Sequence, residues 1–306
     1  MSANTGYRQY LRKYRLLVRS QSGSGTDLTG LRCTFACEKS LNDTPNYSQI
    51  AVYNPSQATI QTIGKGDTVI LEAGYENGNY GMIFTGQIVQ PFVTREDGTD
   101  VVLNLIVQDA DAYLTSSFTC KTIAKGATPE QVVMECLEGA VSRGLISERL
   151  AQSQLPRGRV LFGKSADYVS RIADGNQCQF YIEDGQANIV SASDYAGNQA
   201  VELNPATGLI GTPSQTDDGV SGQCLINPSI KLNTLVYINQ KLVQPKAVSS
   251  AEDGAAAINT DGVYRVVKLT YEGDTRGDAW YCNFEAITQS GVKPDGLSGN
   301  ETNPWR

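Results

Sequence analysis

The chain has 306 residues with 25 basic and 32 acidic side chains, a net charge of -7, no histidine and seven cysteines. Its length allows about two domains with a large core, and 40% hydrophobic against 19% charged residues is typical of a globular protein. The absence of histidine excludes Ser-His-Asp and Cys-His catalytic sites and histidine-containing zinc sites, and no run approaches the ~18 apolar residues that cross a membrane.

The first 19 residues are basic and carry no acid. Residues 20–306 therefore hold 20 bases against 32 acids, a balance of -12, and such an acidic body repels nucleic acid. Tyr14, Leu16 and Val18 alternate with basic residues, which predicts a first strand whose arginines face solvent.

Residues 14–118 predict a run of strands joined by short turns. One expected strand has Leu31, Cys33, Phe35 and Cys37 on a single face. Further strands and hairpins are expected at 50–53, 69–75, 82–84, 87–93 and 101–107. Closely spaced strands of this kind are typical of a barrel or a sandwich.

A small α+β unit is predicted from residue 126 to 192. Residues 128–131, Thr-Pro-Glu-Gln, have the composition of a capping box, and apolar residues follow at helical spacing. This helix is expected to stop at Gly144, and a shorter helix is expected over 165–174, closed by Gly175. A compact hairpin over 178–190 completes the unit.

Strands resume after residue 200. They are expected at 209–210, 224–226, 235–238, 263–271 and 280–287, with a polar hairpin tip at 272–278. Residues 246–261 are rich in Ala, Ser, Gly and Asp and predict a long mobile loop. The tail from 288 onward has no apolar period and is expected to be extended or clamped onto a neighbour.

This order predicts a mainly β protein with a small α+β part. Two β-barrel domains, at residues 1–125 and 196–290, are expected to flank an α+β domain at 126–195, with a C-terminal tail at 291–306. No sequence repeat accompanies this duplication of architecture.

The cysteines predict no metal or cofactor site. Cys33 and Cys37 are four residues apart, but no second ligand pair accompanies them, and on a strand both face the core. The other cysteines lack the histidine or helix N-terminus that activates a thiol. An odd number of cysteines, and only three consecutive apolar residues at 16–18, favour a soluble protein made in a reducing cytoplasm.

Pairs of acidic residues are the only catalytic candidates. Asp109 and Asp111 could share a strand face, and Glu96-Asp97, Glu183-Asp184 and Asp217-Asp218 lie near glycines. A glycosidase needs two carboxylates that face each other across a groove, whereas acids beside glycine are expected in turns for backbone reasons. No enzyme is therefore predicted, and function is expected to lie in surfaces, for which 15 tyrosines are suited.

Two sets of short sequence motifs occur in an order that supports a family resemblance. The first comprises Val69–Tyr75, Gly81–Gly86, Asp109–Ala112 and Thr128–Val133. The second comprises Gly208–Pro213, Gly219–Pro228, Leu235–Ile238, Tyr264–Val266 and Glu272–Gly277 before Trp280. In this order they resemble bacteriophage baseplate hub proteins over about residues 10–290. The extra C-terminal domain of larger family members has no clear counterpart.

The resemblance implies a homotrimer whose six barrels form a ring of near-sixfold symmetry. Such a ring joins a hexameric tail tube to a trimeric central spike and leaves a channel through which DNA passes, which suits an acidic body. It implies a structural protein of the virion, assembled in the bacterial host cytoplasm without membrane insertion. Tail tube, spike, tape-measure and baseplate wedge proteins are the implied partners, and no catalytic residue, cofactor or metal is implied.

Two predicted elements are candidates for contacts between subunits, because barrel edges must be covered in a ring. The candidate residues are Leu209, Ile210, Thr212 and Pro213 on one strand and Asp274, Thr275 and Arg276 at the hairpin tip. Two alternatives remain beside the hub: a carbohydrate-binding tail-tip module, raised by the tyrosines, and a carboxylate-based cell-wall hydrolase, raised by the acid pairs.

Overall fold

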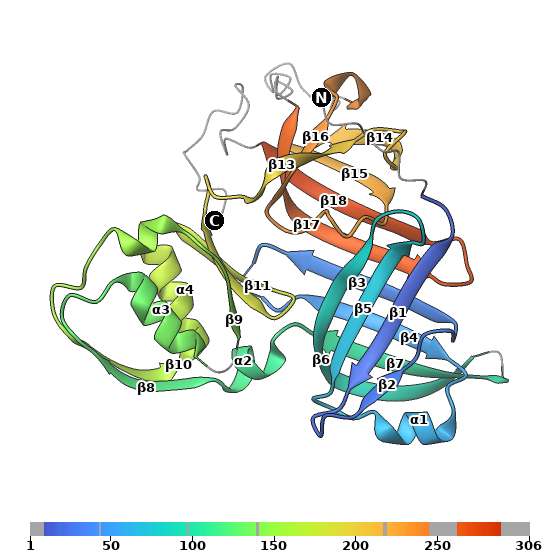
Figure 1. Ribbon diagram of the computed structural model, residues 1–306, viewed down its shortest axis with the longest axis horizontal. Coiled ribbons are helices and arrows are strands. Elements are labelled where there is room, and N and C mark those ends of the chain that lie inside the picture. The colour runs from blue at the N-terminus through green and yellow to red at the C-terminus, as the bar shows by residue number, and fades with distance from the viewer. Residues whose placement is uncertain are drawn as a thin grey trace, which may run out of the picture.

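The computed structural model describes residues 9–42, 44–96, 98–138, 141–216, 219–244 and 262–288. The loop expected at 246–261, the acids Asp97, Asp217 and Asp218, and the tail from 289 onward lie outside these residues. Two β regions and a smaller insert make up the described chain (Figure 1). No described helix has the length and apolar character needed to cross a membrane.

The N-terminal β region contains seven strands and one short helix. They are β1 (Arg12–Arg19), β2 (Gly25–Asp27), β3 (Cys33–Ser40), β4 (Tyr47–Tyr53), α1 (Gln57–Thr62), β5 (Thr68–Tyr75), β6 (Tyr80–Glu96) and β7 (Asp100–Gln108). Leu16 and Val18 are buried on β1 while Arg15 is exposed, which confirms the predicted first strand. The hairpins β5–β6 and β6–β7 are also confirmed.

The insert packs around a core of its own. Its elements are α2 (Asp111–Ser116), β8 (Phe118–Ile123), α3 (Pro129–Leu137), β9 (Ser142–Ile146), η1 (Glu148–Ala151), β10 (Arg159–Lys164), α4 (Ser165–Gly175), β11 (Cys178–Glu183) and β12 (Gln186–Ser191). The capping box is confirmed, since Thr128 Oγ1 accepts the Gln131 N–H at 3.3 Å and Gln131 Oε1 accepts the Thr128 N–H at 3.0 Å.

The expected helix stop at Gly144 is wrong. Helix α3 ends at Leu137, and Gly144 lies in β9, which pairs in parallel with β12. A Cβ at position 144 would lie 2.8 Å from Asn188 Cγ and 3.0 Å from the Ala187 carbonyl oxygen. The glycine is therefore required for the close approach of two strands rather than for a helix cap.

The C-terminal β region holds β13 (Ala196–Leu203), β14 (Leu209–Gln215), β15 (Gly219–Leu225), β16 (Thr234–Ile238), η2 (Gln240–Leu242), β17 (Val263–Asp274) and β18 (Trp280–Thr288). Its described strands join those of the N-terminal region in one sheet of order β14-β15-β18-β17-β3-β4-β7-β6-β5-β1-β2, with β16 attached to β17 and β13 to β16. The mainly β class is confirmed. The described strands do not close into a barrel, because the pairing order starts at β14 and ends at β2.

The two β regions meet where β17 pairs antiparallel with β3, from Lys268 beside Ser40 to Asp274 beside Thr34. Buried side chains of both regions form a single hydrophobic cluster beneath this junction. At its centre the Phe35 ring lies across Gly273 and packs edge-on against Trp280, with 5.6 Å between ring centroids. The regions therefore share a sheet and a core.

Candidate functional site

Eight of the strands, β14-β15-β18-β17-β3-β4-β7-β6, form a stretch of sheet that we call the open sheet. One face of it covers the core, as the alternate buried residues of β3, β17 and β18 show. The opposite face carries short and polar side chains, among them Thr34, Gln49, Asn104, Thr270 and Asn283. We call this the exposed face of the open sheet.

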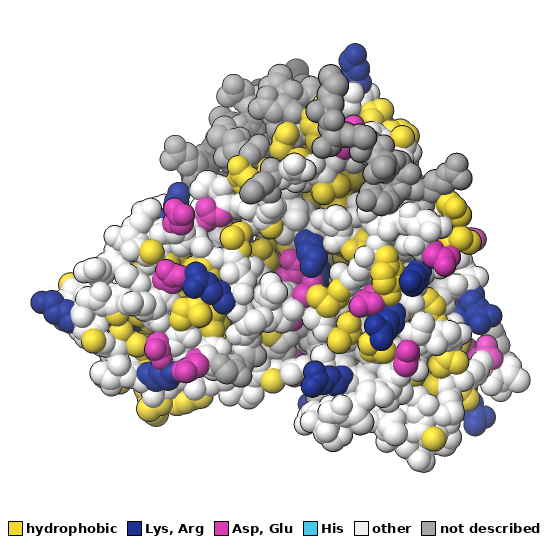
Figure 2. Space-filling model, in the orientation of Figure 1, with side chains coloured by type: hydrophobic (Ala, Val, Ile, Leu, Met, Phe, Trp, Pro, Cys, Tyr) yellow, Lys and Arg dark blue, Asp and Glu magenta, His cyan; other side chains and the backbone are white. Residues whose placement is uncertain are grey.

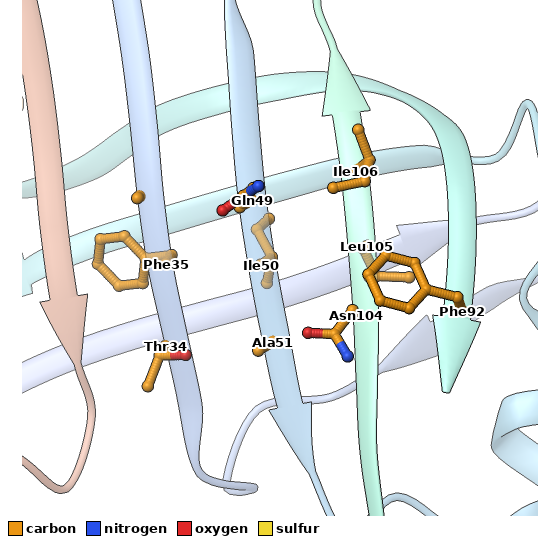
Figure 3. A pocket seen from close by; sticks show the side chains of 10 residues that line it. Thr34, Phe35, Gln49, Ile50, Ala51, Phe92, Asn104, Leu105 and Ile106 are labelled. Atoms are coloured by element: carbon orange, nitrogen blue, oxygen red, sulfur yellow. The ribbon is translucent and has the colours of Figure 1, made fainter. Parts of the chain in front are cut away.

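Two shallow troughs cross the exposed face. One, of about 310 Å³, runs over β3, β4 and β7 and is lined by small or neutral side chains such as Ala36, Ala51 and Asn104. Figure 3 shows the Phe92 ring extending from β6 toward β7 at its rim. The other, of about 480 Å³, runs over β14, β15, β18 and β17. No titratable side chain lines the first trough, so it offers a smooth surface rather than a reactive one.

The charged side chains of the exposed face are mostly acidic. Glu38, Glu272 and Glu285 lie on β3, β17 and β18, and Lys268 Nζ stands 3.7 Å from Glu285 Oε1. A fourth acid, Asp274, is bonded to Arg32. This face therefore repels polyanions more than it attracts them.

One edge of the open sheet is β14. A register shift between Ile210 and Ser214 makes a bulge, and Gly211 takes a φ of +67° there. Ile210 and Thr212 point outward and are exposed, whereas Leu209 and Pro213 are buried. The Gln244 N–H donates to the Pro213 carbonyl at 2.7 Å, so the far end of β14 is covered and the part around the bulge has no partner strand among the described residues.

The other edge is the second half of β6. After Gln87 this strand leaves β5, and from Gln90 to Glu96 its described partner is β7 alone. Val93 pairs with buried Leu103, so it lies on the core side of the sheet, yet 47% of it is exposed. An apolar side chain that faces a core and still meets solvent marks a surface that another strand can cover.

The hairpin tip of β17 and β18 is largely engaged within the chain. Arg32 Nη2 lies 2.8 Å from Asp274 Oδ2, and this bond lowers the pKa of the Asp274 carboxyl. Thr275 exchanges hydrogen bonds with Cys33, accepting at Oγ1 at 2.9 Å and donating its N–H at 3.0 Å. Of the three candidate tip residues, Arg276 alone leaves its side chain exposed.

The basic N-terminal segment, residues 9–19 of the described chain, contacts the hairpin tip of β17 and β18. The sequence did not indicate this role. Arg12 donates from Nη2 to the Asp278 carbonyl at 2.9 Å and lies 5.6 Å above the Trp280 ring. Gln9 Nε2 donates to the Thr207 carbonyl at 3.1 Å, just before β14. These contacts connect β1 and the residues before it to the C-terminal β region.

Besides the two edges of the open sheet, the insert carries an exposed apolar patch. Among the described residues, the three most exposed large apolar side chains share the outer face of the β8–β10 ribbon: Phe118, Val160 and Phe162, at 59%, 67% and 69% exposure. The two phenylalanine rings meet edge to face at 5.0 Å. Figure 2 shows apolar atoms at the edge of the insert where β8 and β10 run, while charges of both signs are scattered elsewhere on this side. The sequence did not indicate these strands.

The acidic pairs whose two members are both described, Asp109 with Asp111 and Glu183 with Asp184, do not form a groove with facing carboxylates. Asp109 and Asp111 separate, since Asp111 lies in the first turn of α2 and Asp109 is buried. Glu183 and Asp184 join Lys39 in a buried ionic cluster. Cys33 and Cys37 are confirmed as core residues, and burial raises the pKa of the Cys37 thiol to about 12.

Residues 44–286 match the family described as Baseplate hub gp41. The chain belongs to this family of phage tail baseplate proteins. The resemblance found in the sequence is thereby confirmed. No curated protein matches the chain.

Solved structures share the fold at low sequence identity. The 43 kDa tail protein of prophage MuSo2 from Shewanella oneidensis has a TM-score of 0.60 at 10% identity, covering 91% of this chain and 99% of that one. A tail protein from Neisseria meningitidis has a TM-score of 0.59 at 11% identity, covering 94% and 99%. A chain in the Francisella PdpA-VgrG complex gives 0.57 at 7%, covering 97% of this chain and 61% of that one.

Proposed function

We propose that this protein is the structural hub of a phage tail baseplate and that three copies form a ring of near-sixfold symmetry. The two β regions, residues 1–125 and 196–290, act as tube-like barrel domains that neighbouring strands complete. Residues 126–195 form the α+β domain between them, joined by α2 and β8 at the end of the first range, which pack in the insert, and 291–306 are a tail. The observation that carries the proposal is the open sheet, of which β14 around its bulge and the second half of β6 each have one side without a partner strand among the described residues.

Ring closure uses these two edges. The β14 edge of one copy pairs with the second half of β6 in the next copy, and a head-to-tail contact of this kind closes when three rotations complete a circle. Val93 is then covered on the core side, where it adds to the surface around Leu209 and Pro213. Ile210 and Thr212 contact Phe92 on the exposed face. Each copy loses its open edges in this way.

The hairpin tip has a divided role in this arrangement. Asp274 and Thr275 fix the shape of the tip through Arg32 and Cys33, at 2.8 and 2.9 Å. Arg276 projects from the fixed tip and contacts the neighbouring copy.

The exposed face of the open sheet lines the channel. The neutral trough over β3, β4 and β7 and the excess of acids over bases on this face suit the passage of DNA without sequence-specific binding, because like charges reduce adhesion to the phosphate backbone. The two rims of the ring adapt the hexameric tail tube to the trimeric central spike, and the tape-measure protein lies on the same axis.

The apolar patch of Phe118, Val160 and Phe162 lies on the insert, outside the open sheet. Exposed apolar patches commonly mark contacts with other proteins. We assign this patch as the contact site for a baseplate wedge protein. The hub is then a component of the virion, assembled in the host cytoplasm, and no enzymatic step is proposed for it.

Charge placed on the two edges tests the ring. Ile210→Lys and Val93→Lys, each measured by multi-angle light scattering of the full chain co-expressed with its spike, are expected to convert trimer to monomer. Leu145→Lys is the matched control, because Leu145 is 38% exposed on β9, as Ile210 is 37% exposed on β14. A trimer that survives both edge variants, or dissociates equally in the control, contradicts the proposed contact.

A further inference from the structure

A buried cluster of charges lies where the β11–β12 turn of the insert meets the open sheet. Lys39 on β3 places its ammonium 2.8 Å from Asp184 Oδ1 and 3.3 Å from Glu183 Oε1, and all three side chains are less than a tenth exposed. Lys231, in the segment before β16, places Nζ 3.6 Å from Asp184 Oδ2 and is 43% exposed. The cluster thus joins three parts of the chain.

Asp109, at the end of β7, adds a third carboxyl to the cluster. Its Oδ1 accepts the Gly185 N–H at 2.9 Å, and its Oδ2 is buried without a hydrogen-bond partner among the described residues. The residue is 1% exposed. With every group ionised, three carboxylates would face one buried ammonium and one half-exposed ammonium. A buried anion without full pairing is costly, so a proton is the simplest compensation.

The surroundings favour Asp109 as the group that holds this proton. Burial and the charge of Asp184 raise the pKa of the Asp109 carboxyl to about 7, against the opposing effects of the Gly185 N–H and Lys39. Burial also raises the pKa of Glu183, but Glu183 faces Lys39 directly. Burial alone would lower the pKa of Lys39, and the charges of Glu183 and Asp184 outweigh it and raise that pKa.

Two further titratable groups lie beside the cluster and stay neutral. Cys37 precedes Lys39 on the buried side of β3, and Tyr271 on β17 donates its hydroxyl to the Ile230 carbonyl. Burial raises the pKa of both groups far above neutrality. Neither group therefore changes its charge between pH 4 and 8, which leaves the proton to the carboxyls, among which Asp109 has an Oδ2 without a hydrogen-bond partner among the described residues.

We propose that protonation of Asp109 stabilises the packing of the insert against the open sheet. We call this proton-dependent contact the catch. When it is protonated, the cluster closes around the Asp184-Gly185 turn. When it is ionised, an unpaired buried anion stands against Asp184, and the β11–β12 hairpin opens more readily. The catch is a property of the single chain and goes beyond the proposed ring, so its test does not depend on assembly.

The sign and size of the effect follow from linkage. An opened hairpin exposes Asp109 to water, where its pKa returns to ~3.9, so opening releases a proton at any pH between that value and the folded one. The opening equilibrium should therefore rise about tenfold per pH unit between roughly pH 4.5 and 6.5 and become level above pH 7 to 8.

Hydrogen exchange of the amides in residues 178–191, corrected for the intrinsic pH dependence, measures this equilibrium in the full chain. Asp109→Asn keeps an acceptor for the Gly185 N–H but has no titratable proton, so the opening of the β11–β12 hairpin in this variant should not vary with pH. Asp184→Asn, at a position with a φ of +53° that asparagine tolerates, should move the plateau to lower pH. Exposed Asp174→Asn is the control and should behave like the unaltered chain.

Two results would overturn the catch. One is an unaltered chain whose corrected opening is the same at pH 5 and pH 7. The other is an Asp184→Asn variant whose plateau stays in place. If Asp109→Asn fails to fold, these two measurements still decide whether the proton on Asp109 controls the opening of the hairpin.

Discussion

A methyl group added at Gly273 tests the junction that joins the two β regions. A Cβ at this position would lie 2.6 and 2.9 Å from Cε1 and Cε2 of Phe35, inside van der Waals contact. The ring cannot simply rotate away, because it packs on Trp280 at 5.6 Å and is 4% exposed. Overpacking of this kind costs about 1–3 kcal/mol, and we expect that loss in the free energy of unfolding of Gly273→Ala.

Urea unfolding of the full chain measures the loss as a lower midpoint at unchanged slope. Gly25→Ala is the control, since a Cβ there would meet no atom within 4 Å and its φ is not in the left-handed region; it should be neutral or stabilising by up to ~1 kcal/mol. Phe35→Leu shortens the opposing side chain, so the double variant should cost less than the sum of the single variants, with a coupling of about 1 kcal/mol or more. Strictly additive losses, or no loss in Gly273→Ala, would refute the reasoning.

Two further substitutions test parts of the fold. Lys39→Met should destabilise the chain by about 3–5 kcal/mol in urea unfolding, because it leaves buried Glu183 without its ammonium partner and buried Asp184 with the half-exposed Lys231 alone. Lys231→Met, which removes only that half-exposed partner, should cost less than ~1 kcal/mol, and equal losses would contradict the burial argument. Thr128→Ala should cost about 1 kcal/mol by removing the N-cap of α3, measured by thermal unfolding, and an unchanged midpoint would show that the cap does not hold the helix.

Local patterns in the sequence predicted much of the fold. The alternation of Cys33, Phe35 and Cys37 is a strand signal that needs only neighbouring residues, and so is the capping box at Thr128. Gly144 misled because a glycine that ends a helix and a glycine that permits close strand contact look the same in a sequence. Strands β8 and β10 were missed because apolar residues lie on both of their faces: Phe118, Val160 and Phe162 face outward while Ile123 and Leu161 are buried, so apolar and polar residues do not alternate.

Contacts between distant residues could not be read from the sequence. Lys39 continues the buried alternation of β3, and nothing nearby shows that its carboxylate partners lie 144 and 145 residues away. The pairing of β3 with β17 likewise joins residues more than 200 positions apart. The candidate tip was correctly expected to be a polar hairpin, but the partners of Asp274 and Thr275 come from before β3 and from its first residue.

A three-dimensional reconstruction by electron microscopy of the protein assembled with its spike would show directly which strands meet between neighbouring copies. We expect a closed ring of three chains, with β14 of each copy beside the second half of β6 in the next and the exposed face of the open sheet lining the axial channel. Chains that meet through other surfaces, with both edges left open to solvent, would contradict it.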